Sequence, residues 1–249
     1  VVHRAHASTE AITHIVPAVA GLLLEKEVST LCMAMAAPER PLVAVIGGAK
    51  ISDKIGFIER LLEVADTIFI AGAMANTFLK QAGHEIGKSK YETDQEEIIA
   101  TILQKAKPDQ LKLPTEVVVA KEIAMDSQSR ACAVEAVQSD EFVLDIAPSS
   151  MKAYADALQD AATVIWNGTL GMAELPPFAK ASAELANLIA GKQGALTSII
   201  GGGDTADFVL SWLNKNPSAE FTHISTGGGA SLELMSGMNL PGVEALLQR

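Results

Sequence analysis

Two lysines, Lys50 and Lys54, follow a glycine pair in the segment 43–54, which reads VAVIGGAKISDK. The pattern is typical of a strand, a glycine turn and the start of a helix. A spacing of four residues predicts both ammonium groups on one face of that helix, beside its positive end, where they would suit a polyphosphate. The alternative is a solvated lysine pair on a surface helix. Because GxxxxGK[ST] and GxGxxG are both absent, any nucleotide site here is of another type.

A second glycine turn, GGGDTA at 201–206, follows the apolar run 197–200. Three glycines free the backbone to approach an anion, and Asp204 or Thr205 can cap the helix that follows. We expect Asp204 to hold Mg²⁺ on nucleotide phosphates, because one carboxylate plus phosphate oxygens usually suffices for this ion. The alternative is an ordinary loop with an aspartate cap, and both functions can coexist.

Two further turns give weaker signals. Asn167 could meet a phosphate and Glu174 could accept hydrogen bonds from ribose hydroxyls, although Asn-Gly is a common turn and glutamate is usually solvated. The segment 226–231, TGGGAS, predicts either another anion-facing helix start or a hinge. We identify no Ser-His-Asp arrangement, nucleophile elbow or Cys/His metal cluster in the sequence.

Short apolar runs rich in Val, Ile and Thr alternate with helical stretches. Continuous rather than alternating apolarity predicts strands buried on both faces. The predicted strands are 42–46, 67–71, 116–120, 142–146, 162–166, 196–200 and 222–225, and the predicted helices are 51–64, 94–106, 149–159, 179–190 and 205–213. This order predicts an α/β fold, a doubly wound, mainly parallel, Rossmann-like sheet flanked by helices on both faces. Residues 107–114 read as a polar loop.

Five of the predicted strands end in glycine or asparagine, including Gly47 after the first and Gly72 after the second. Ligands of doubly wound sheets bind beyond the carboxyl ends of the strands. Glycine at so many of these ends predicts close approach of the backbone to a ligand.

The composition narrows the class of protein. Nineteen Lys and Arg against 30 Asp and Glu give a net charge of −11, which argues against nucleic acid and anionic membranes as partners. Cys32 and Cys132 are too few for a disulfide framework and have no metal-ligand spacing, so we expect a reducing, cytoplasmic setting. No apolar run reaches the roughly 20 residues of a membrane-spanning helix.

The first 35 residues differ from the rest. Apolar residues at near-helical spacing over 9–35, with Pro17 as the only breaker, predict a helix that links to another domain. The chain begins at Val1 without an initiator methionine, and we expect a fragment. We therefore expect this segment and the tail at 240–247 to expose apolar surface.

In chain order, these motifs closely resemble the phosphoglycerate kinase family. The motifs are HRAHAS at 3–8, GGAK with DK at 47–54, WNG at 166–168, GGGDT at 201–205, STGGGASLE at 225–233 and LPGVEAL at 240–246. The resemblance implies an enzyme of two domains that transfers a phosphoryl group reversibly between 1,3-bisphosphoglycerate and Mg-ADP, giving 3-phosphoglycerate and ATP in glycolysis. It implies that 1–36 end the N-terminal domain with an interdomain helix, and that 37–249 bind the nucleotide.

The resemblance also implies roles for single residues. Arg4 matches the basic patch that grips phosphoglycerate, Lys50 the lysine that steadies the transferring phosphoryl group, and Lys54 a lysine on the nucleotide phosphates. Glu174 matches the glutamate that binds the ribose of the nucleotide. The residues matched to the nucleotide phosphates and their Mg²⁺, or placed near the nucleotide, are Gly47, Gly72, Asn167, Gly202, Gly203, Asp204 and Thr205, with Asp204 on the metal.

The chain also departs from the family pattern. Thr169 stands where the family has proline and Ala173 where it has phenylalanine, which we expect to loosen a loop beside the nucleotide; Ala147 and Met238 also depart. The leading hypothesis is a kinase domain that binds nucleotide and lacks full activity by itself. Two alternatives remain: a nucleotide-binding scaffold without catalysis, and an NAD-type dehydrogenase domain, against which the absent GxGxxG argues.

Overall fold

The structure, a computed structural model, describes residues 1–247. Its helices and strands, in chain order, are η1 (Ala11–His14), α1 (Leu22–Ala36), β1 (Leu42–Ile46), η2 (Ser52–Lys54), α2 (Ile55–Val64), β2 (Thr67–Ile70), α3 (Gly72–Gln81), α4 (Glu96–Lys105), β3 (Leu111–Lys112), β4 (Glu116–Ala120), β5 (Ser129–Ala133), η3 (Val134–Ala136), β6 (Phe142–Ile146), α5 (Pro148–Gln159), β7 (Thr163–Asn167), η4 (Pro176–Phe178), α6 (Lys180–Ala190), β8 (Thr197–Gly201), α7 (Gly203–Leu213), β9 (His223–Ile224), α8 (Gly229–Met235) and α9 (Pro241–Leu247).

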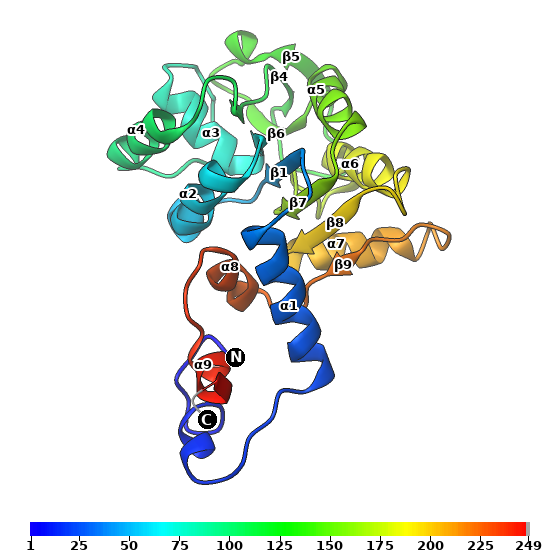
Figure 1. Cartoon of the computed structure of the whole chain (residues 1–249). Helices are drawn as coiled ribbons and strands as arrows, with labels where there is room; N and C mark the ends of the chain where they lie inside the picture. The colour runs from blue at the N-terminus through cyan, green and yellow to red at the C-terminus, as the bar shows by residue number, and fades with distance from the viewer. Residues whose placement is uncertain (248–249) are drawn as a thin grey trace.

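Six parallel strands form the main sheet, in the order β3-β2-β1-β7-β8-β9. Figure 1 labels β1, β7, β8 and β9 of this sheet. From β1 the chain moves outward through β2 to β3, and from β7 it moves the other way through β8 to β9. The direction therefore reverses between β1 and β7, where Ile46 lies opposite Asn167. This arrangement confirms the doubly wound, mainly parallel sheet that the sequence predicts.

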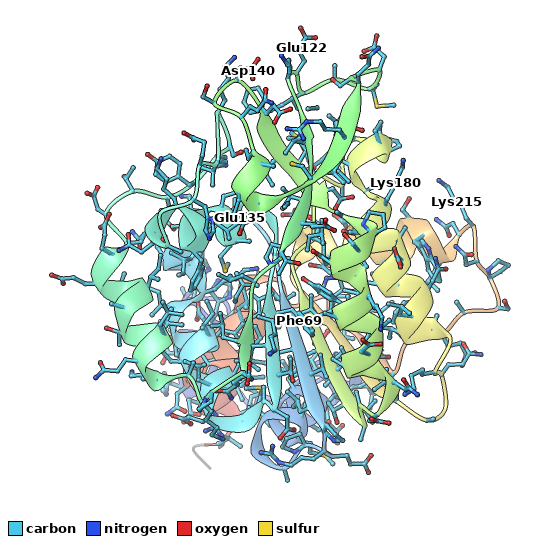
Figure 2. The ribbon with its side chains drawn as sticks, turned by 90° about the horizontal axis from the view of Figure 1, so that it is seen from above. Phe69, Glu122, Glu135, Asp140, Lys180 and Lys215 are labelled. Atoms are coloured by element: carbon cyan, nitrogen blue, oxygen red, sulfur yellow. The ribbon has the colours of Figure 1, made fainter. Side chains whose placement is uncertain are left out.

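Helices cover both faces of the main sheet. Successive side chains of each strand point to opposite faces, so the strands contribute to two separate cores. In β1, Ala44 and Ile46 pack in the core shared with α1, α2, α3, α4 and α8, whereas Val45 packs in the core shared with α5, α6 and α7. Seen from above, Phe69 of β2 lies in the middle of the molecule between the helical layers (Figure 2). Its ring stacks on Tyr154 of α5, with centroids 4.0 Å apart.

Strands β4 and β6 do not join the main sheet. With β5 they form a separate antiparallel sheet of order β5-β4-β6, at the top of Figure 1. The prediction that 116–120 and 142–146 belong to the parallel sheet is therefore wrong. β4 is apolar because it is buried on both faces within the small sheet's surroundings: it packs against Leu79 and Ile86 on one face and near Phe178 on the other. β5 has no predicted counterpart, since its first three residues are exposed.

Three smaller differences concern connecting segments. The predicted polar loop 107–114 contains β3, which pairs with β2 as the edge strand of the main sheet. Helices α3 and α9 have no predicted counterparts, because Gly72 and Pro241 at their starts are typical turn residues.

The sequence predicts one helix over 9–35, but the structure has two separate helical segments there. η1 ends at His14, α1 begins at Leu22, and residues 15–21 are not helical. Pro17 explains the interruption, because proline disfavours the helical conformation in the residue before it. The expected exposure of apolar side chains is confirmed for the N-terminal segment, since Ile15, Val19 and Leu22 are more than four-fifths exposed. In the tail it holds for Leu247, which is 71% exposed, but not for Leu240, which is 2% exposed. Within residues 1–247, no helix combines the length and apolarity that crossing a membrane requires.

One buried carboxylate fastens α1 to the edge of the main sheet. Glu27 accepts hydrogen bonds from His223 Nε2 at 3.0 Å, Ser225 Oγ at 2.8 Å and the Thr226 N–H at 2.8 Å. Burial alone would raise the pKa of Glu27, but these hydrogen bonds together hold the pKa below its ordinary value. The helix that precedes β1 is therefore tied to the turn that follows β9.

Candidate functional site

The ends of β1 and β7 meet where the strand order reverses, the place at which doubly wound sheets bind ligands. The Gly47 N–H donates to the Asn167 carbonyl at 2.9 Å. A Cβ atom on Gly47 would lie 2.0 Å from the Thr169 carbonyl oxygen, and one on Gly168 would lie 2.3 Å from that of Gly47. Both distances are far inside van der Waals contact, so only glycine fits at these two positions.

Lys54 places a cation at this junction. Its Nζ donates to the carbonyl of Gly47 at 2.8 Å and lies 3.3 Å from that of Asn167, so it joins the ends of both strands. Burial lowers the pKa of Lys54 to about 8, although the nearby carboxylates of Asp204 and Asp53 act in the opposite direction. Below that pH the junction carries a positive charge in a poorly hydrated position, where electrostatic attraction to an anion is strong.

Two other helical starts at this edge have N–H groups that are already occupied. The carboxylate of Glu92 accepts from the N–H groups of Ile51 and Ser52, at 2.8 and 3.1 Å, at the start of the 3-10 turn η2 that precedes α2. At the start of α3, the N–H groups of Gly72 and Met74 donate to backbone carbonyls of neighbouring turns. These starts cannot bind a ligand without giving up hydrogen bonds within the chain.

The start of α7 is different. Gly202, with a φ of 88°, precedes the helix, and for the N–H groups of Gly203, Asp204 and Thr205 we find no acceptor within residues 1–247. Free N–H groups and the helix dipole make such a start an anion-binding site. The Thr205 hydroxyl is already engaged, since it accepts from the Gly168 N–H at 2.6 Å and joins β7 to α7. The Asp204 side chain is exposed.

Asn167 adds an unpartnered donor beside this helix start. It is 1% exposed, and within the described chain its Nδ2 has no hydrogen-bond partner. A Cβ on Gly201 or on Gly202 would lie 3.1 Å from that nitrogen. Buried polar groups are nearly always hydrogen-bonded, and an exception calls for an explanation such as strain, a catalytic role or a bound water or ion. The amide therefore points to a polar group of a ligand at the start of α7.

A cleft of about 280 Å³ opens from this edge toward the small sheet. Its walls come from α3, from β6 and from the loop after β7, and Asp204 and Glu174 line it as acidic groups. Much of the lining is apolar, with Val117, Phe142, Leu144, Ile146, Leu170 and Met172 among its residues. An apolar slot with a few polar groups at one end suits a flat ring joined to a charged tail.

Asp145 at the end of β6 holds one wall of the cleft. Its carboxylate accepts from the Ile146 N–H at 2.9 Å and from the Ala181 N–H, at the start of α6, at 3.1 Å. Burial raises the pKa of Asp145 to about 7, although these N–H groups and Lys180 lower it. A Cβ on Gly171 would lie 2.3 Å from the carboxylate, so the loop after β7 packs directly on it.

This carboxylate predicts a pH-dependent stability. With a pKa of about 7 against the ordinary 3.8, the folded chain binds more protons than the unfolded chain between these values. The free energy of unfolding should therefore contain a part, up to ~4 kcal/mol, that falls as pH rises through this window. Urea unfolding near pH 4 and near pH 7.5 should show a weaker fall in Asp145→Asn than in the unmodified chain. Asp160→Asn, at an exposed aspartate, is the matched control, and equal pH dependence in all three chains would contradict the assignment.

The predicted site residues fall into three groups. Gly47, Gly72, Asn167, Glu174, Gly202, Gly203, Asp204, Thr205 and Lys54 lie at the carboxyl edge or line its cleft. Lys50 is at the same edge, but the prediction that it shares a helical face with Lys54 is wrong, because Lys50 precedes the first helical residue and Lys54 ends η2. Arg4 belongs to the N-terminal segment, in which the Val2 carbonyl accepts from the Gly242 N–H of α9; in Figure 1 the N-terminus lies beside α9, away from α3 and the small sheet.

The donor set fits a metal ion that arrives with a phosphate ligand. Within residues 1–247, no three His, Cys, Asp or Glu side chains are grouped so that they could hold a metal by themselves. Asp204 supplies one exposed carboxylate beside the free N–H groups of α7. Mg²⁺ on nucleotide phosphates is commonly held by one or two carboxylates together with phosphate oxygens.

Sequence reasoning missed three kinds of residue. The sequence pattern places the apolar wall from β6 in the main sheet, gives Asp145 no role and does not single out Glu92. Asp145 binds the N–H of Ala181, and Glu92 binds those of Ile51 and Ser52; these partners are far away in the chain, and no local pattern reports such contacts. The signal that could have revealed the wall is the run of Val, Leu and Ile at 142–146 directly before the predicted helix at 149–159.

Fold and edge together define a class of protein: a doubly wound α/β domain whose strand-order reversal carries a buried lysine and a helix start with free N–H groups beside an apolar cleft. A profile of the family described as phosphoglycerate kinase matches residues 1–238. The chain belongs to the phosphoglycerate kinase family.

Individual relatives agree with this assignment. The chain is 47% identical over 249 residues to the phosphoglycerate kinase of Moorella thermoacetica and 45% identical to that of Pelotomaculum thermopropionicum; each alignment covers 99% of this chain and 62% of the relative. The solved phosphoglycerate kinase of Coxiella burnetii matches with a TM-score of 0.92 at 38% identity, covering 100% of this chain and 64% of that one. The Pyrococcus horikoshii structure gives a TM-score of 0.83 at 27% identity, covering 99% and 61%. The chain thus spans less than two thirds of the length of these relatives.

Proposed function

We propose that this chain is the nucleotide-binding part of a phosphoglycerate kinase, which transfers a phosphoryl group reversibly between 1,3-bisphosphoglycerate and Mg-ADP. The observation that carries the proposal is the free start of α7, with Asp204 on it and Lys54 behind it, at the point where the strand order reverses. This edge opens onto an apolar cleft of a size that suits a purine.

The nucleotide is placed by different parts of the edge. Its base enters the cleft between α3 and β6, its ribose hydroxyls donate to Glu174, and its phosphates accept from the N–H groups of Gly203 and Asp204. The side-chain amide of Asn167 gains its missing acceptor from a phosphate oxygen. Asp204 would hold Mg²⁺, which supplies charge neutralisation on the phosphates.

The transfer itself needs no protein nucleophile. Charge spreads over the oxygens of the transferring phosphoryl group, and fixed cations and N–H groups stabilise it. Lys54 is the fixed cation at the junction, and Lys50, whose side chain is exposed at the same edge, is the cation that can follow the transferring group. Both lysines lie on the segment that leaves β1, so one turn positions them.

The other substrate belongs to the rest of the protein in this proposal. Residues 1–36 end the N-terminal domain and link it to the nucleotide-binding domain 37–249, and Arg4 contributes to the site for 3-phosphoglycerate. Closure of the two domains would exclude water from the acyl phosphate, so the chain by itself lacks full activity. The net charge of −11 supports a protein that binds neither nucleic acid nor membranes, and the two isolated cysteines favour a reducing, cytoplasmic setting.

The departure at Thr169 leaves its loop tied on both sides. The Thr169 hydroxyl donates to the Gly171 carbonyl at 3.0 Å, and its own carbonyl accepts from the Gly48 N–H at 3.3 Å. These contacts argue against the looser loop expected from the missing proline. They favour retained nucleotide binding.

Calorimetric titration tests the proposal. Mg-ADP should bind this chain with one-to-one stoichiometry, and ADP with excess EDTA should bind more weakly, because Asp204 then meets the phosphates without the metal. NAD with Mg²⁺ is the comparison that separates a kinase site from a dehydrogenase site. Saturable NAD binding without Mg-ADP binding, or no binding of either nucleotide, would overturn the proposal.

A further inference from the structure

The turn that carries Lys50 and Lys54 is held by a residue from a distant loop. Glu92 lies in the loop between α3 and α4, and its Oε2 accepts from the Ile51 N–H at 2.8 Å and the Ser52 N–H at 3.1 Å. Its Oε1 accepts from the Ser52 hydroxyl. Because the Ile51 N–H belongs to the peptide unit that joins Lys50 to Ile51, the carboxylate fixes the peptide plane that directly follows Lys50.

The same contact fixes Lys54. The Lys54 N–H donates to the Ile51 carbonyl at 2.9 Å, which closes the 3-10 turn η2. A shift of Ile51 therefore moves the Cα of Lys54 and withdraws its ammonium group from the carbonyls of Gly47 and Asn167.

Glu92 is in turn held by α3. Its own N–H donates to the Thr77 hydroxyl at 3.1 Å, and two residues earlier the Lys90 carbonyl accepts from Asn76 Nδ2 at 3.1 Å. Thr77 and Asn76 are both buried, at 3% and 2% exposure. The contacts form a continuous chain from α3 through the loop to the lysine turn.

The charge of Glu92 also acts on the turn. Burial raises the pKa of Glu92, but hydrogen bonds from Ser52 and Ile51 and the positive charge of Lys50 outweigh it, so the pKa lies below its ordinary value. The ionised carboxylate is therefore the form that clamps the turn at neutral pH, and charge-assisted hydrogen bonds are the stronger kind.

We propose that Glu92 is a positioning residue, which holds Lys50 and Lys54 in the geometry required at the phosphates. This inference rests on the proposed function. In this proposal Glu92 itself does not contact the nucleotide. Misplacement of a catalytic group by about 1 Å can lower a rate roughly a hundredfold, so a residue that acts only through the backbone can have a large effect.

Two measurements on this chain test the proposal. Glu92→Ala should weaken Mg-ADP binding roughly tenfold or more, because it leaves the turn unclamped. NMR titration of labelled lysine side chains should show the pKa of Lys54 move upward from about 8, because the ammonium group becomes hydrated when it leaves its backbone cage. Glu92→Gln keeps an acceptor oxygen and should restore most of both properties. Glu96→Ala, which removes an exposed carboxylate from the first turn of α4, is the matched control.

Each outcome decides one question. If Glu92→Ala lowers stability but leaves both the Mg-ADP affinity and the Lys54 titration unchanged, Glu92 is only structural and the inference is wrong. If the unmodified chain binds no Mg-ADP, the proposed function fails, yet the Lys54 titration still tests the positioning. If Glu92→Ala does not fold, Thr77→Val replaces it, because this variant removes only the hydroxyl that accepts from the Glu92 N–H. Thr77→Val should shift the pKa of Lys54 in the same direction as Glu92→Ala. An unchanged Lys54 titration in this variant would overturn the inference.

Discussion

Replacement of Lys54 by methionine is expected to weaken Mg-ADP binding roughly ten- to hundredfold, the effect of losing one or two hydrogen bonds to a charged group. Methionine fills a similar volume and removes only the charge and its hydrogen bonds. The Lys54 ammonium group lies against the carbonyls of Gly47 and Asn167 behind the start of α7, where little water screens it. Calorimetry at pH 7 measures the change in affinity.

The pH dependence gives the same prediction a second test. The protonated amine attracts the phosphates, and the pKa of Lys54 in the free chain is about 8. A bound polyphosphate raises this pKa, so the affinity should be constant below about pH 8 and should fall as pH rises above it. In Lys54→Met this fall should be absent.

A matched control separates position from charge. Lys80 on α3 is exposed and lies outside the cleft lining, so Lys80→Met removes the same charge and should leave the affinity nearly unchanged. Thermal unfolding of both variants checks that the fold is intact. Equal affinities in Lys54→Met and Lys80→Met would show that Lys54 does not act on the nucleotide.

Gly47→Ala should destabilise the chain by ~3 kcal/mol or more, a large part of the ~5–15 kcal/mol that stabilises a typical domain. The new Cβ would lie 2.0 Å from the Thr169 carbonyl oxygen and 2.7 Å from that of Gly168. Both obstacles are backbone atoms, so the strain can be relieved only if β1 or β7 shifts at the centre of the main sheet. Such a shift would disturb the register between these strands.

Urea unfolding measures this change, and Gly203→Ala is the control. Gly203 lies at the same edge, in the first turn of α7, but a Cβ there meets nothing within 4 Å. Alanine in a helix is favoured over glycine by ~0.5–1 kcal/mol, so this variant should be as stable as the unmodified chain or slightly more stable. A midpoint for Gly47→Ala equal to that of Gly203→Ala would mean that the contact at Gly47 relaxes without strain.

Local patterns in the sequence predict the central strands of the main sheet and the edge that carries the site. The strands at 42–46 and 67–70 lie where continuous apolar runs predict them, because burial on both faces leaves a local signature in the sequence. The glycines after β1, β2, β7 and β8 are equally local signals, since a backbone in close contact tolerates no side chain. Parallel strands end at one edge, so these signals together locate the site.

Local signals failed where burial has more than one possible cause. The apolar runs of β4 and β6 read like strands of the parallel sheet, yet they belong to the antiparallel sheet that forms a wall of the cleft. The sequence records that these residues are covered and does not record what covers them.

Only the folded chain determines which backbone N–H and carbonyl groups at this edge are free and which are hydrogen-bonded within the chain. Glu92 occupies the N–H groups before α2 from 41 residues away, and Lys54 reaches the Asn167 carbonyl across 113 residues. Consequently α7 keeps its first N–H groups free while the start of η2 does not, and burial lowers the pKa of Lys54. Hydrogen-bond partners and desolvation depend on residues that only the folded chain brings together, whereas periodicity and glycine placement depend on neighbours along the chain.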